Sequence, residues 1–144
     1  WSSDVCSSDL AFDHFLGRPL SIPAGDKVDA DRATRIKFQV EVRARNCENW
    51  LPLWRVVARY ATESPDIAHR ADIVRELTRR RIELLYQREL ATLAAAERTA
   101  TVGAIEALVD FESWGRLRHH YRLSYEDACA AWIRMVDRLL PATP

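Results

Sequence analysis

Residues 103–141 read GAIEALVDFESWGRLRHHYRLSYEDACAAWIRMVDRLLP, and this stretch decides the fold. Its apolar residues recur at intervals of three and four, which is the period of one face of an α-helix. Ser124 is placed to cap a helix, with Asp127 three residues later as a weak capping box, and Pro141 ends the run. The stretch therefore predicts helical structure throughout, with a last helix over about residues 125–140.

The same period continues upstream of this stretch. Pro52 is expected to separate two helices, because proline fits the first turn of a helix but not its interior. Ser64 and Pro65 form the clearest helix start, as N-cap and first helical residue. After residue 109 the chain either bends at Gly115 or extends the preceding helix. The sequence predicts an all-α bundle of about five to six helices, of which the upstream ones cover about residues 29–46, 50–62, 66–93 and 95–109.

Size and composition favour one globular domain. The chain has 144 residues, 48% of them hydrophobic, and its 21 basic residues equal its 21 acidic ones. A balanced charge gives no overall attraction to nucleic acid or to an anionic membrane, and no apolar run is long enough to span a bilayer. The three cysteines, at positions 6, 47 and 129, are odd in number and widely spaced. They indicate buried reduced thiols in a cytoplasmic protein and no disulfide framework.

No group of residues has the spacing of a catalytic or metal site. The adjacent His119 and His120 point to different faces of a helix, so they make a poor metal-binding pair. The chain contains none of the common nucleophile, zinc, phosphate or dinucleotide motifs. We therefore expect no enzyme activity, no metal and no cofactor. The basic run at residues 79–81 has Glu76 and Glu83 beside it, which favours a solvated helix face over a phosphate-binding stripe.

The last expected helix carries an excess of apolar residues. Around Trp132 only Arg134, Asp137 and Arg138 interrupt the apolar run. Such a helix is buried nearly all round. Two explanations remain open at this point: it is a well-buried core helix, or it is covered once by its own domain and once by a partner.

Residues 103–141 resemble the end of TetR-type transcriptional regulators. The resemblance extends over about residues 28–140 and includes the middle helices with their Ser-Pro step at Ser64. Arg122 stands where Gly is common in that family. The positions that carry the match in the closing segment are Ala107, Leu108, Trp114, Leu117, Arg118, Leu123, Ser124, Ala128, Leu139 and Leu140.

The resemblance implies a domain that binds a small apolar or aromatic effector and forms a homodimer through its last two long helices. DNA would be contacted only through an N-terminal three-helix domain, for which this chain leaves no room. Residues 1–10 are similar to an in-frame translation of a sequencing-library adapter, and we expect them to be an artefact joined to a truncated reading frame. Residues 11–27 would be the end of a connecting helix and a loop, and residues 28–144 the effector-binding and dimerisation domain.

The family plan also suggests which residues meet the effector and which meet the second subunit. The candidate ligand-binding residues are Phe38, Val42, Asn46, Trp50, Trp54, His69, Tyr86 and Trp114. The candidate dimer-interface residues are Ile105, Leu108, Glu112, Leu117, Ala128, Trp132, Ile133 and Val136. The alternative is a stand-alone α-helical protein-interaction module that uses the same apolar surface; an internal cavity would favour the effector-binding domain instead.

Overall fold

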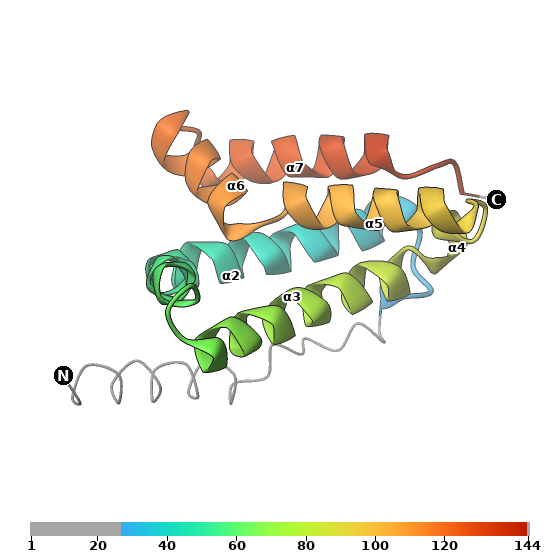
Figure 1. Ribbon diagram of the computed structural model, residues 1–144. Helices are drawn as coiled ribbons and strands as arrows, with labels where there is room; N and C mark the ends of the chain where they lie inside the picture. Colours follow the sequence, from blue (N-terminus) through green and yellow to red (C-terminus); the bar gives the residue numbers. More distant parts are fainter. Residues whose placement is uncertain (1–26, 144) are drawn as a thin grey trace.

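A computed structural model describes residues 27–143, and this part of the chain is all-α (Figure 1). Four long helices form the bundle: α2 (Arg32–Tyr60), α3 (Pro65–Leu85), α5 (Ala95–Leu108) and α7 (Tyr125–Leu139). Helix α2 packs against α3 and α7, and α5 packs against the same two helices. Neighbouring helices run in opposite directions, so the bundle has up-down-up-down topology (Figure 1). The expected adapter-derived segment, residues 1–10, and the connecting-helix end and loop expected over residues 11–27 lie outside the described residues, except for Lys27.

Helix α2 is continuous through Pro52, so the predicted division into two helices is wrong. The Asp31 side chain caps it by accepting a hydrogen bond from the Thr34 backbone N–H at 2.9 Å. Figure 1 shows the last part of α2, where the ribbon turns from teal to green, running at a steep angle to the first part. A bend without a break is the usual result of a proline inside a helix, because it removes one backbone hydrogen bond.

Helix α3 begins as the sequence predicts, with Ser64 as N-cap and Pro65 as its first residue. It ends at Leu85, earlier than predicted, and after Tyr86 the short helix α4 (Gln87–Leu90) follows. Leu77 and Leu84 of α3 are each 45% exposed. The apolar residues of α3 therefore cover both its buried face and part of its outer face.

The closing segment contains two short turns between its long helices. Helix α5 matches the predicted 95–109 helix, and α6 (Phe111–Gly115) follows after a break at Asp110. A π-helical turn, η2 (Arg116–His120), continues α6. Ser124 then caps α7 through a 3.0 Å bond from the Asp127 backbone N–H, as predicted. Arg122, just before this cap, has a φ of 55°, which is left-handed backbone.

The core is richest in aromatic side chains where α2, α6 and α7 meet. The rings of Trp114 and Trp132 lie 4.8 Å apart, and Tyr125 stands edge-on to Trp114 at 5.5 Å. Trp54 of α2 stacks on Phe111 of α6 at 4.7 Å. Cys47 and Cys129 are buried free thiols, as predicted, and burial raises the pKa of Cys47 to about 12. These contacts hold α2, α6 and α7 together at the end of the bundle that contains α6, which is the end opposite the described C-terminus (Figure 1).

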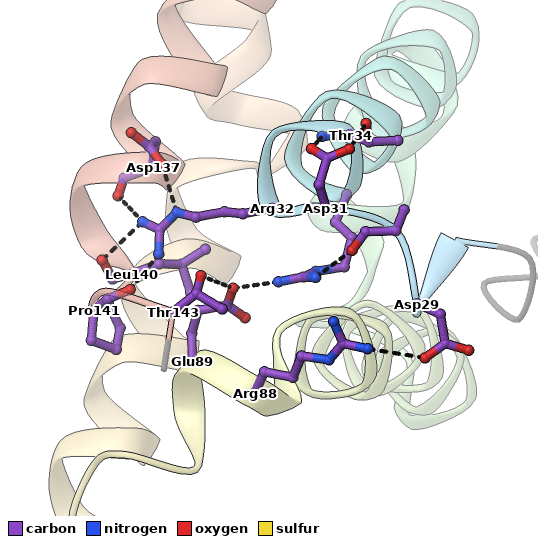
Figure 2. Close-up of polar contacts among 12 residues, drawn as sticks. Asp29, Asp31, Arg32, Thr34, Arg88, Glu89, Asp137, Leu140, Pro141 and Thr143 are labelled. Atoms are coloured by element: carbon purple, nitrogen blue, oxygen red, sulfur yellow. Dashed lines mark hydrogen bonds and ion pairs between the residues drawn. The ribbon is translucent and has the colours of Figure 1, made fainter.

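A polar cluster joins the start of α2 to the end of the chain (Figure 2). Arg32 binds the Asp137 carboxylate through Nε at 2.8 Å and donates to the carbonyls of Asp137 and Leu140 through Nη2. Arg35 and Glu89 form an ion pair in which both side chains are buried, and the Thr143 hydroxyl donates to the Glu89 carboxylate at 2.7 Å. Helices α2, α4 and α7 are therefore linked by charged groups at this end of the bundle.

Candidate ligand cleft

Two adjoining cavities lie between α2, α3 and α5. The smaller, here called the α2–α3 cavity, has a volume of about 50 Å³; the larger, the α3–α5 cavity, has about 220 Å³. They share three lining residues, Arg43, Val74 and Thr78, so they lie next to each other, and the two together are here called the cleft. Ligand sites are commonly found between the helices of bundles.

Helical periodicity accounts for the walls of the α2–α3 cavity. Two rows line it, each spaced at i, i+3, i+4 and i+7, so each row occupies a single helix face. The row on α2 is Gln39, Val42, Arg43 and Asn46, and the row on α3 is Val74, Leu77, Thr78 and Arg81. Each row mixes apolar with polar side chains, which is typical of a binding site and unusual for a core seam.

The α3–α5 cavity has a different lining. The Trp54 ring lines one side of this cavity. The Arg75 guanidinium lies over the ring, 5.7 Å from its centroid. On α5, Gly103 leaves open space where a side chain would stand. Glu106 and Asp110 bring two acidic groups to this cavity, opposite the two basic groups Arg43 and Arg75. Burial raises the pKa of Glu106, while the charges of Arg75 and Arg43 act in the opposite direction.

The structure brings three of the eight predicted ligand-binding residues to this cleft. Val42 and Asn46 line the α2–α3 cavity, and Trp54 lines the α3–α5 cavity. Phe38 lies beside the cleft, with its ring 5.6 Å from the Arg81 guanidinium. The other four line neither cavity: Trp50 and Tyr86 pack on or within the core, His69 is exposed, and Trp114 is buried with its indole N–H donating to Glu48 at 2.6 Å.

Sequence reasoning missed the charged residues of the cleft. Arg81 belongs to the basic run at residues 79–81, which the sequence predicts to be a solvated helix face. Its two neighbours fit that prediction, because Arg79 pairs with Glu76 and Glu83, and Arg80 pairs with Glu76. Arg81, in contrast, lines the α2–α3 cavity. The available signal was its register, because residue 81 lies seven positions after Val74 and four after Leu77 on the same helix face.

The predicted dimer residues divide into buried and accessible groups. Ile105, Ala128, Trp132 and Val136 are each at most 1% exposed within a single chain. Of the two explanations that the sequence leaves open, burial within the chain's own core therefore applies to these four residues, and a second subunit is not needed to cover them. Leu108, Leu117 and Ile133 are half-buried against the core, and Glu112 is exposed and forms a 3.5 Å ion pair with Arg55.

Comparison with known proteins finds no relative of this chain. No protein-family model, curated protein or solved structure matches the chain. Among residues 27–143 no cluster of His, Cys, Asp and Glu has the arrangement of a metal site. None of the helices in this range is long and apolar enough to cross a bilayer.

Proposed function

We propose that this chain is the effector-sensing and dimerisation domain of a cytoplasmic, TetR-type transcriptional regulator. The observation that carries the proposal is the cleft formed by the α2–α3 and α3–α5 cavities, whose walls come from three helices of the bundle. The resemblance of residues 28–140 to that family supports the same function. DNA would be contacted by a separate domain, and the protein would act by binding, not by catalysis.

Dimerisation in this proposal uses the exposed sides of α5 and α7. These two helices pack against each other at one edge of the bundle (Figure 1). On α5 the exposed side carries small residues, among them Ala100, Ala104 and Ala107, and α7 exposes Met135 and Leu139. Small side chains allow a second pair of helices to approach closely. An effector in the cleft touches α5 through Gly103 and Ala107, so it lies next to this surface.

The experiment for the sensing role blocks the cleft from α5. A Cβ added at Gly103 meets nothing within 4 Å, and Gly103 lines the α3–α5 cavity, so we expect a larger side chain to be accommodated there and to obstruct the cavity. We expect small aromatic compounds to raise the melting temperature of the wild type and to quench its tryptophan fluorescence through Trp54. Gly103→Phe should lose both effects, and Gly103→Ala, whose methyl group leaves the cavity open, should keep them. A broad panel of neutral and charged compounds that shifts neither signal in the wild type contradicts the proposal.

A second candidate function, a stand-alone protein-interaction module, is favoured by one observation. Ile73, Leu77 and Leu84 of α3 are 36%, 45% and 45% exposed, which is unusual for large apolar side chains on one helix. A module of this kind would keep its melting temperature in every small molecule tested. Its partner binding would depend on Leu84 and be unaffected by Gly103→Phe.

A further inference from the structure

Arg81 holds hydrogen-bond donors that nothing in the described chain uses. Its Nε and Nη2 atoms are buried without a hydrogen-bond partner, and its guanidinium forms no ion pair in residues 27–143. One face of the guanidinium lies over the Phe38 ring. Burial lowers the pKa of Arg81, and the nearby charge of Arg43 lowers it further. Arg81 as a whole is half-buried, but an arginine whose donor atoms are buried normally pairs with a carboxylate or phosphate, which fits its planar set of donors.

The other walls of the α2–α3 cavity add a second positive charge and no negative one. Arg43 uses Nε to bind the Val109 carbonyl at 2.8 Å and stacks on Phe111 at 4.5 Å, and it forms no carboxylate pair among the described residues. Gln39 is 2% exposed and its Oε1 lacks a partner. Because rotation of the amide exchanges its oxygen and nitrogen, Gln39 can donate to an anion. The cavity is therefore lined by two cations, neutral polar groups and apolar groups, with no acid.

The two cavities differ in size and charge in a way that suits one kind of molecule. A volume of about 50 Å³ accommodates a few water molecules or one small polar group, whereas about 220 Å³ accommodates an aromatic ring or a short chain. In the α3–α5 cavity Glu106 and Asp110 balance the two arginines, and Trp54 offers an aromatic wall. A ligand with an anionic head and an uncharged apolar body matches this division.

We propose that the effector is a small organic acid whose carboxylate binds Arg81 and Arg43 in the α2–α3 cavity, with its apolar body against Trp54 in the α3–α5 cavity. This inference rests on the proposed function and specifies its ligand class. Binding requires no covalent step. The carboxylate supplies the acceptors that the buried Arg81 donors lack, and its single negative charge reduces the repulsion between the two arginines that face this cavity.

The test compares acids with their uncharged amides by titration calorimetry at pH 7 on the full chain. The pairs are benzoate and benzamide, phenylacetate and phenylacetamide, and 3-phenylpropionate and 3-phenylpropionamide. We expect at least one acid to bind about tenfold or more tightly than its amide, as a charge-assisted bond requires. Acetate and inorganic phosphate, which lack the apolar body, should bind far more weakly.

Two arginine variants on the same helix form the matched pair. Arg81→Gln should weaken binding of the acid about tenfold or more and leave the amide unchanged. Arg80→Gln removes the same charge from an exposed position that pairs with Glu76, and should leave both ligands unchanged. Arg81→Lys keeps the charge without the planar donors and should retain part of the preference for the acid. If Arg81→Gln does not fold, Arg43→Gln takes its place with the same expected loss.

Each other outcome overturns the inference. Equal affinity for acids and amides, or acid binding that is unaffected in both Arg81→Gln and Arg43→Gln, shows that the cleft does not select an anion. Such a result leaves the proposed function standing if neutral compounds still bind in a manner blocked by Gly103→Phe. Failure of every acid to bind also overturns the inference, and the neutral compounds then decide the proposed function separately.

Discussion

At the scale of single residues, Arg122 stands where the backbone is left-handed and where a glycine would be expected from the TetR-type pattern. Its φ of 55° is a conformation that costs a residue with a side chain about 1–2 kcal/mol relative to glycine. The strain arises because the chain must reverse between η2 and the Ser124 cap within a few residues. Glycine, which is common at this position in the TetR-type pattern, adopts this backbone without strain, whereas this chain has arginine.

Arg122→Gly is expected to raise the free energy of unfolding by up to about 1 kcal/mol, because relief of strain exceeds the extra flexibility of glycine in the unfolded chain, about 0.4–1 kcal/mol. Urea denaturation measures the change. Arg134→Gly is the control, since Arg134 is exposed within α7 and glycine there should cost about 1 kcal/mol. Equal destabilisation by both substitutions would mean that the left-handed backbone at Arg122 carries no strain.

At the scale of elements, helix starts marked by a local cap were predictable, whereas the break predicted at Pro52 and the predicted end of α3 near residue 93 were wrong. Ser64, Pro65 and Ser124 satisfy free backbone N–H groups locally, so their effect can be recognised without knowing the fold. Whether α2 continues past Pro52 depends on contacts that are distant in sequence, because residues on both sides of the proline contact α6: Leu51 lies near Gly115, and Trp54 stacks on Phe111. The helix therefore continues where local propensity predicts a break.

The candidate cleft was partly predictable for the same reason. The family plan and the aromatic content of the sequence pointed to three residues of the cleft, Val42, Asn46 and Trp54. Arg81 was missed because the basic run was treated as one face, although its helical register with Val74 and Leu77 distinguishes it from Arg79 and Arg80. Likewise, Arg35 and Glu89 are separated by 53 other residues in the sequence, and nothing local marks them as a buried pair.

The Arg35–Glu89 pair leads to a prediction about how α2 and α4 are held together. Arg35→Met should cost about 3–5 kcal/mol, because it leaves the Glu89 carboxylate buried without its cation. Arg35→Met combined with Glu89→Leu should be less destabilised than the sum of the single variants. Arg79→Met, which disrupts a pair that is about 40% exposed, should cost no more than about 1 kcal/mol. Chemical denaturation of the four variants checks this, and additive losses would contradict it.

At the scale of the whole molecule, the bundle itself covers most of the apolar excess of its last helix. Trp132 and Val136 are enclosed by a single chain, so apolar content alone does not require a second subunit. The apolar content of the last helix suggested that a second subunit covers it, because composition alone cannot show how much of that surface the other helices of the same chain bury. What remains on the outside of α5 and α7 is a smaller set of short side chains with Met135 and Leu139.

Oligomeric state therefore has to be tested on exposed positions. If α5 and α7 pair with those of a second copy, light scattering should report a dimer, and Ala104→Arg should convert it to a monomer by placing a charge between closely packed helices. Ala58→Arg, on the exposed side of α2, is the matched control and should leave the dimer intact. Trp132→Arg is unsuitable, because a charge inserted among fully buried rings unfolds the chain whether or not it dimerises. A folded monomer at every accessible concentration, or a dimer indifferent to Ala104→Arg, rules out this surface and leaves the cleft as the only part of the proposed function still to be tested.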